Sequence, residues 1–153
     1  MANAGKPSVL LVDDNEATCT LMTALLQRDF QIEVAADGLE AVDKLRTNQY
    51  AAVILDLLMP QHDGFEVLDF LQANNPKMLR RVLVVTALLS KREIDRASSY
   101  AICGIVAKPF DVDTLLAAVK QCAGEPDDGG KLGGVFCTPM ILLIADLLRQ
   151  RLG

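Results

Sequence analysis

Long apolar runs are missing from this sequence of 153 residues. No stretch approaches the roughly 18 consecutive apolar residues that a membrane-spanning helix needs, so we expect no membrane contact through such a segment. The first residues, 1–7, also lack the apolar core of a secretion signal. Together these two absences favour a cytoplasmic protein.

Excess positive charge and metal-type cysteine spacing are missing as well. The 15 lysines and arginines are outnumbered by 20 aspartates and glutamates, and the formal net charge is -5. An acidic chain is repelled by the phosphate backbone, so we expect no nucleic-acid binding. None of the four cysteines forms a C-x-x-C pair, which argues against a zinc site, and we expect free, mostly buried thiols. These cysteines are Cys19, Cys103, Cys122 and Cys137.

Five short apolar runs alternate with helical patterns along the first 123 residues. Continuous apolar runs of this length are typical of strands buried on both faces, and strands that alternate with helices predict a parallel sheet covered on both sides. The run at 31–35 is less apolar than the others, so we place it near an edge of the sheet. The predicted strands are 9–12, 31–35, 51–55, 82–85 and 105–107. The predicted helices are 15–28, 39–46, 65–73, 90–100 and 111–122, with Asn15, Ser90 and Asp111 as N-caps and Asp37-Gly38 as a turn or cap.

The last thirty or so residues differ in composition from the rest. Residues 124–137 are rich in glycine and acidic residues, which is typical of a flexible linker. Thr138 and Pro139 then favour a helix start, and we predict a C-terminal helix over 138–151. Residues 140–145 are all apolar. Two alternatives therefore stay open: a helix that packs on its own domain or frays, and a helix that binds a partner or a second copy.

Five polar residues stand at the carboxyl ends of the predicted strands. They are Asp13, Asp14, Asp56, Thr86 and Lys108. Because ligands of open α/β sheets bind just beyond the carboxyl ends of the strands, all five point to one pocket. Each has a simpler interpretation on its own, as a helix cap, a turn residue or a surface loop. Their joint placement favours a site.

The residue types at these strand ends suit phosphoryl transfer. Adjacent carboxylates repel one another unless a cation lies between them, and three carboxylates without a nearby histidine or cysteine favour Mg²⁺ over zinc. Asp56 stands alone at its strand end and is the best nucleophile, since a carboxylate can form an aspartyl phosphate. The Thr86 hydroxyl, the Lys108 ammonium and the metal could each hold one phosphoryl oxygen.

These residues also carry a family resemblance. The matching motifs are Val12-Asp13-Asp14, Leu55-Asp56-Leu57-Leu58-Met59-Pro60 with Asp63-Gly64, Thr86-Ala87, and Lys108-Pro109-Phe110. Over residues 8–123 the chain resembles the receiver domain of a two-component response regulator, of the stand-alone kind found in chemotaxis.

The resemblance implies a flavodoxin-like (βα)5 fold, a doubly wound parallel sheet of order 2-1-3-4-5. It also implies that Asp56 accepts phosphoryl from a histidine kinase or a phosphotransfer protein. Asp14, Asp56 and the backbone carbonyl of Leu58 would bind Mg²⁺, with Asp13 acting through water.

Two departures from the family pattern bear on the switch. Ile105 stands where an aromatic residue often couples to the threonine. Leu58 and Leu88 are apolar at the positions, two past Asp56 and two past Thr86, that flank the hydrolytic water in similar domains. We therefore expect slow loss of phosphate.

We expect a phosphorylation-dependent switch that signals through protein contacts to a downstream protein target and is not a turnover enzyme. The thirty residues after the receiver are too few for a DNA-binding domain, which favours a stand-alone receiver in a phosphorelay. Homodimer formation through the C-terminal helix, or through the face made by 90–100, 105–107 and 111–122, stays open. The alternatives are a receiver-fold binding module that works without phosphorylation, and a phosphohydrolase. The second needs an acid where Leu58 stands.

Overall fold

The computed structural model describes residues 5–59, 64–87 and 90–124. Strands and helices alternate along these residues. The strands are β1 (Ser8–Val12), β2 (Gln31–Ala35), β3 (Ala52–Leu55), β4 (Val82–Ala87) and β5 (Gly104–Lys108). The helices are α1 (Glu16–Leu26), α2 (Gly38–Thr47), α3 (Gly64–Asn74), α4 (Pro76–Leu79), α5 (Lys91–Ser98) and α6 (Val112–Ala123). The predicted helix 138–151, and all of the predicted linker after residue 124, lie outside the described residues.

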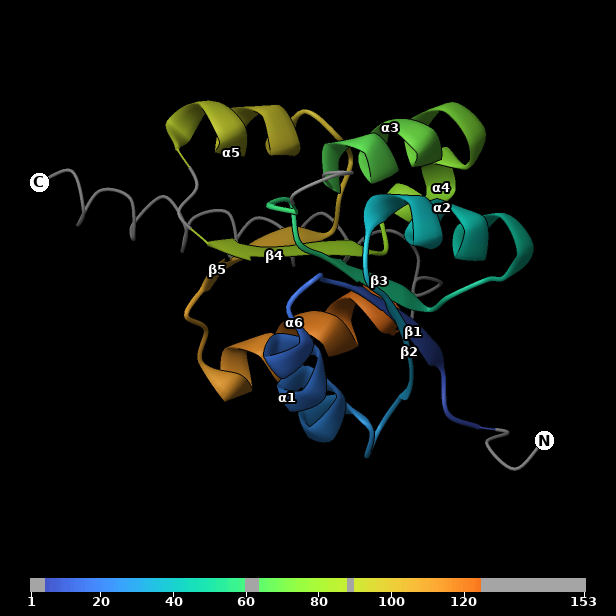
Figure 1. Ribbon diagram of the computed structural model, residues 1–153, viewed down its shortest axis with the longest axis vertical. Helices are drawn as coiled ribbons and strands as arrows, with labels where there is room; N and C mark the ends of the chain where they lie inside the picture. The colour runs from blue at the N-terminus through green and yellow to red at the C-terminus, as the bar shows by residue number, and fades with distance from the viewer. Residues whose placement is uncertain (1–4, 60–63, 88–89, 125–153) are drawn as a thin grey trace, which may run out of the picture.

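The five strands form one sheet of order β2-β1-β3-β4-β5, and every neighbouring pair is parallel. Helices α1 and α6 lie on one face of this sheet, whereas α2, α3, α4 and α5 lie on the other (Figure 1). The predicted flavodoxin-like α/β fold is therefore confirmed. So is the position of β2 at an edge.

The core lies in two layers, one on each face of the sheet. Leu10 and Val12 of β1 pack in the layer beneath α2 and α3, and Val9 and Leu11 pack in the layer toward α1 and α6. All four side chains are almost completely buried. Burial on both faces explains why the strands appear in the sequence as continuous apolar runs and do not alternate with polar residues.

Polar side chains begin four of the helices in the way the sequence predicts. At each start, one side-chain oxygen accepts a hydrogen bond from the backbone N–H three residues later. The capping residues are Asn15, Asp37, Ser90 and Asp111. Because each cap directly follows a strand end or its loop, these caps fix where the chain turns away from the edge of the sheet that carries the polar residues.

The short helix α4 was not predicted. The stretch Asn74-Asn75-Pro76 ends α3, as expected, but Pro76 then occupies the first position of a new turn, where its missing N–H costs nothing. Met78 and Leu79 are buried in the layer beneath α3, so burial of two apolar side chains favours this extra turn.

The prediction of free thiols was wrong for two of the cysteines. Cys103 and Cys122 form a disulfide, with their Cα atoms 5.9 Å apart. They are 19 residues apart along the chain, and only the path of β5 and α6 brings them together. Cys19 is free and buried, as expected. Cys137 lies outside the described residues.

Candidate functional site

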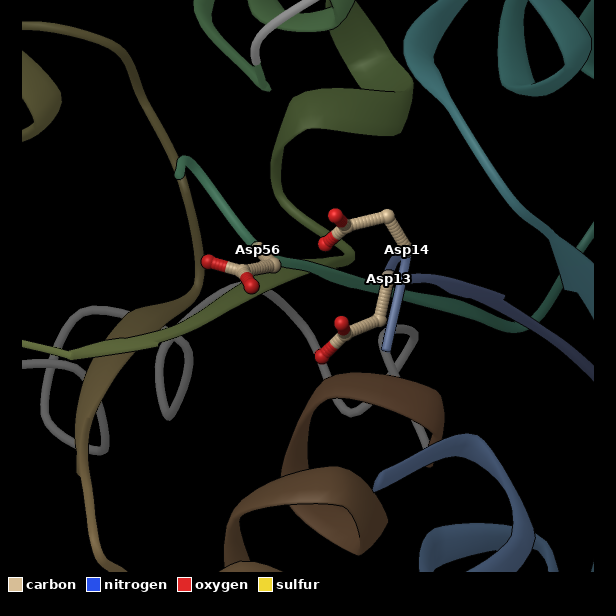
Figure 2. A group of neighbouring side chains, drawn as sticks. All are labelled: Asp13, Asp14 and Asp56. Atoms are coloured by element: carbon tan, nitrogen blue, oxygen red, sulfur yellow. The ribbon is translucent and has the colours of Figure 1, made fainter. Parts of the chain in front are cut away.

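The predicted site residues meet at the carboxyl edge of the sheet. Asp13 and Asp14 follow β1, Asp56 follows β3, Thr86 lies near the end of β4, and Lys108 ends β5. The three carboxylates lie close together (Figure 2), and one oxygen of each lies within 4.8 Å of the others.

Sheet hydrogen bonds fix the backbone of the two central aspartates. The Asp13 N–H donates to the Ala35 carbonyl at 3.1 Å, and the Asp56 N–H donates to the Val12 carbonyl at 3.0 Å. The ladder of parallel hydrogen bonds thus continues one residue beyond β1 and β3. Both carboxylates are consequently held by rigid backbone and not by a loose loop.

The site is buried on one side and open on the other. Asp13 and Asp56 are only 3% and 6% exposed, and Thr86 is completely buried, whereas Asp14 is exposed. Burying a carboxylate is costly unless it is paired or hydrogen-bonded. The buried pair of carboxylates therefore needs a compensating cation, and Asp14 is the carboxylate of the site that meets solvent.

Lys108 supplies that cation. Its Nζ donates to Asp13 Oδ2 at 2.8 Å and to Asp56 Oδ2 at 3.2 Å. Burial alone would lower the pKa of the Lys108 ammonium, but its hydrogen bond to Asp13 and the negative charges of Asp56 and Asp13 outweigh this effect and raise this pKa. One ammonium against three carboxylates still leaves an excess of negative charge in the pocket.

The second oxygen of Asp56 is also held. Asp56 Oδ1 accepts a hydrogen bond from the Thr86 hydroxyl at 3.0 Å and another from the Leu58 N–H at 3.0 Å. Asp13 Oδ1 accepts from the Asn15 N–H at 2.9 Å. With Lys108 on Oδ2, both oxygens of the Asp56 carboxylate have a defined direction, which is what a positioned nucleophile requires.

The donor set fits Mg²⁺. All three ligand candidates are carboxylates, the excess charge is negative, and Asp14 leaves room for water, which Mg²⁺ retains when bound. One oxygen of each of the three carboxylates lies within 4.8 Å of the other two, so a single divalent ion could be shared among them.

Gly64 packs against the site in a way that we did not predict. A Cβ at this first residue of α3 would lie 2.6 Å from the Asp56 carbonyl oxygen and 2.9 Å from the Leu57 Cα. The close approach of α3 to the backbone of Asp56 therefore requires glycine. The sequence signal was present, because Gly64 belongs to the quoted motif, but its packing partner is visible only in the fold.

Cys19 is a second neighbour that sequence reasoning missed. Its Sγ donates to the Asp13 carbonyl at 3.3 Å from the first turns of α1. Burial, helped by the negative charge of Asp13, raises the pKa of the Cys19 thiol to about 11. The buried thiol thus packs beside the pocket, with its S–H directed at the Asp13 carbonyl.

Comparison with known proteins gives one consistent family. Residues 9–120 match the family model described as the response regulator receiver domain. Response regulator MprA of Mycobacterium sp. (strain KMS) is 33% identical over 124 residues, which cover 79% of this chain and 53% of that protein. Transcriptional regulatory protein ZraR of Klebsiella oxytoca is 32% identical over 114 residues, which cover 74% of this chain and 25% of that protein. The chain thus spans about half the length, or less, of these curated relatives.

Solved structures of similar shape agree. The receiver domain of Francisella response regulator 1452 has a TM-score of 0.70 and 27% identity, and the match covers 77% of this chain and 97% of that one. Chemotaxis protein CheY4 of Vibrio cholerae has a TM-score of 0.68 and 28% identity, with coverage of 76% and 98%. The match covers nearly the whole of both solved chains.

Proposed function

Because this chain belongs to the response regulator receiver domain family, we propose that it is a phosphorylation-dependent switch that accepts a phosphoryl group on Asp56. The observation that carries the proposal is the doubly held Asp56 carboxylate, with Thr86 and Leu58 on one oxygen and Lys108 on the other. Receiver domains as a class serve two-component signalling and are generally not turnover enzymes. We therefore expect this chain to act as a signalling switch and not as a turnover enzyme.

In the proposed reaction, an Asp56 oxygen attacks the phosphorus of a phosphohistidine. A P–O bond forms, the P–N bond breaks, and the imidazole leaves. Lys108 passes from Asp56 Oδ2 to one phosphoryl oxygen, and the Thr86 hydroxyl binds another. Receiver domains typically bind Mg²⁺ in an acidic pocket, and here Asp14, Asp56 and the Leu58 carbonyl would hold it, with Asp13 acting through water. The ion would add positive charge where the transferred oxygens lie.

The proposed donor is a histidine kinase or a phosphotransfer protein, and the proposed setting is the cytoplasm. Across the described part of the chain, no helix has the length and apolar character needed to cross a membrane. We propose that the output travels to a downstream protein through the face of α5, β5 and α6. Thr86 and Lys108 belong to β4 and β5, so phosphorylation at the site acts directly on the strands that support this face.

The test is phosphorylation with acetyl phosphate and Mg²⁺, read by intact-protein mass spectrometry. We expect a single phosphoryl addition that is absent in Asp56→Asn. The control is Asp113→Asn, which removes an exposed carboxylate in the first turn of α6 and leaves Asp56 unchanged. A protein that is still modified in Asp56→Asn would show that Asp56 is not the acceptor.

A receiver-fold binding module that works without phosphorylation is the second candidate. Ile105, which is 2% exposed, fills a core position that would otherwise suit an aromatic coupling residue. The same mass measurement separates the two functions, because a module of this kind shows no phosphoryl addition. A phosphohydrolase is less well supported, since Leu58 offers no acid two residues after Asp56. Release of inorganic phosphate from an added phosphate ester would support it.

A further inference from the structure

The Cys103–Cys122 disulfide lies at the end of β5 that is remote from the acidic pocket. Cys103 directly precedes β5, and Cys122 lies in the last turn of α6. The loop that the disulfide closes contains all of β5, with Lys108 at its far end, and nearly all of α6. One covalent bond therefore encloses the element that contributes the lysine of the site.

This bond ties an edge of the sheet to a helix that covers it. Within residues 5–59, 64–87 and 90–124, β5 pairs with β4 and lies at the edge of the sheet. α6 lies across β3 and β4 and beside α1 (Figure 1). At the start of β5, the Cys103 N–H donates to the Val82 carbonyl at 2.8 Å, and the Cys103 side chain is bonded to α6.

Without the disulfide, the end of α6 has weaker attachments. Lys120 reaches Asp29 at 3.7 Å, but both side chains are about half exposed, and such surface pairs contribute little. Cys122 packs in the apolar layer with Val119. As a thiol it would still fit there as a small apolar side chain, so we expect the fold to survive reduction while the last turn of α6 loosens.

We propose that Cys103 and Cys122 are a reversible dithiol–disulfide pair, a redox modification site that fixes or frees the end of α6. Cysteine pairs that are oxidised in a reducing compartment are usually transient and redox-sensing, not permanent staples. Both sulfurs are nearly buried, at 6% and 5% residue exposure, so exchange needs local opening. Cys122 is the second-to-last residue of α6, just before the C-cap Gly124, where fraying costs least.

The exchange balances with a low-molecular-weight disulfide as the oxidant. The thiolate of one cysteine attacks that disulfide, forms a mixed disulfide and releases one small thiolate. The second cysteine thiolate then attacks the protein sulfur, forms the Cys103–Cys122 bond and releases the second small thiolate. Two electrons pass from the protein to the oxidant, and the two protons end on the two small thiols.

The redox site and the phosphoryl site are separate. Five residue steps along β5 place Cys103 roughly 16 Å from Lys108, since a strand rises about 3.3 Å per residue. The inference rests on the proposed cytoplasmic setting, because that setting decides whether the pair is mostly reduced or oxidised in the cell. It does not need Asp56 to accept a phosphoryl group. The experiment is therefore run on the intact chain and on Asp56→Asn, and a failure of phosphorylation leaves its outcome unaffected.

The experiment equilibrates the full chain in a series of reduced and oxidised glutathione mixtures. Thiols are then blocked and counted by mass spectrometry after proteolysis. We expect the Cys103–Cys122 cross-linked peptide to give way to two free thiols within the range of mixtures found between a cytosol and a secretory compartment. Cys137→Ser is run in parallel, and the transition should persist in it.

The structural consequence is measured on the same samples. Reduction should lower Tm by roughly 10 °C, because the bond closes a loop of about twenty residues. It should also speed hydrogen exchange at the end of α6 while leaving β1 unchanged. In Cys103→Ser/Cys122→Ser neither quantity should depend on the glutathione mixture. The proposal is overturned if the pair stays entirely reduced, or entirely oxidised, across the series. It is equally overturned if the double variant keeps the redox-dependent change in Tm.

Discussion

Lys108 carries the electrostatic balance of the site at the scale of single residues. Among the residues described, it is the cation that ion-pairs with both Asp13 and Asp56. The pKa of Lys108 is raised, so its contribution to stability is fully present below the unfolded-state pKa of about 10.4. That contribution is lost only as the pH rises through the higher folded-state pKa. Near neutral pH the full contribution is therefore in place.

Replacing Lys108 measures how much unfolding free energy is lost when the buried carboxylates of Asp13 and Asp56 have no cationic partner. In Lys108→Met, two buried carboxylates lose their shared partner, and we expect metal-free protein to lose about 3 kcal/mol of unfolding free energy. Urea denaturation with and without Mg²⁺ measures this, and Mg²⁺ should restore more stability in the variant than in the parent.

Lys120→Met is the matched control, because Lys120 of α6 makes an exposed ion pair with Asp29, which precedes β2. It should change stability by no more than about 1 kcal/mol. Equal losses in the two variants would mean that the Lys108 pairing contributes no more than a surface ion pair does.

We expect Leu58 to influence how long the proposed phosphoryl group lasts. Its side chain is 46% exposed and lies two residues beyond Asp56, where it offers no hydrogen bond to an attacking water. In Leu58→Asn, one added hydrogen bond of about 1 kcal/mol should shorten the lifetime of the phosphorylated protein roughly five- to tenfold. Phosphate release after removal of the donor measures the lifetime, with Leu39→Asn, an exposed leucine on α2, as the control. An unchanged or longer lifetime in Leu58→Asn would contradict this role.

At the scale of elements, α5 depends on its cap more than the other long helices do. Ala97 is its one buried residue, and Ile94 is only partly buried, so less apolar packing holds α5 in place than holds the other long helices. Ser90 and Glu93 form a reciprocal capping box, in which the Ser90 hydroxyl accepts from the Glu93 N–H and Glu93 accepts from the Ser90 N–H. The cap is therefore a main source of stability for this part of the proposed output face.

Ser90→Ala should destabilise α5 by about 1 kcal/mol and leave the rest of the sheet intact. Hydrogen exchange resolved by peptide is the measurement, and protection should fall in 91–98 only. Ser98→Ala, an exposed serine at the other end of α5, is the control and should change little. Loss of protection in β4 or β5 as well would mean that α5 is not an independent unit.

The sequence predicts most of these elements because their causes are local. Apolar runs buried on both faces identify the strands. Asn15, Ser90 and Asp111 mark helix starts, because each cap needs only a hydrogen bond to the backbone N–H three residues later in the sequence. The convergence of the five strand-end residues also follows, since parallel strands end at one edge. Features that depend on contacts between distant parts of the chain could not be predicted from the sequence. The disulfide depends on the path of the chain over 19 residues, and α4 depends on a buried face supplied by α3.

At the scale of the whole molecule, the acidic pocket and the disulfide lie at opposite ends of β5. The carboxyl end of β5 carries Lys108 in the acidic pocket, and its beginning adjoins the disulfide to α6. The pocket concentrates negative charge, because three carboxylates face one ammonium. Folding thus brings together charges that are far apart in the unfolded chain, and a divalent cation that binds only the folded state should stabilise it.

Mg²⁺ should therefore raise the stability of the whole domain, and Asp14 is the residue to test. At one hundred times its dissociation constant, a ligand specific for the folded state adds about 2.7 kcal/mol. Asp14 is exposed, so Asp14→Asn removes a proposed ligand without disturbing the core. We expect metal-free Asp14→Asn to be at least as stable as the parent, since one repulsive charge is gone, and to lose most of the Mg²⁺-dependent rise in Tm.

Thermal denaturation over a Mg²⁺ titration measures both quantities, with Asp113→Asn as the control for loss of one exposed carboxylate. If Asp14→Asn keeps the full Mg²⁺ effect, the ion binds elsewhere, because a ligand of the pocket cannot lose a carboxylate at no cost in affinity.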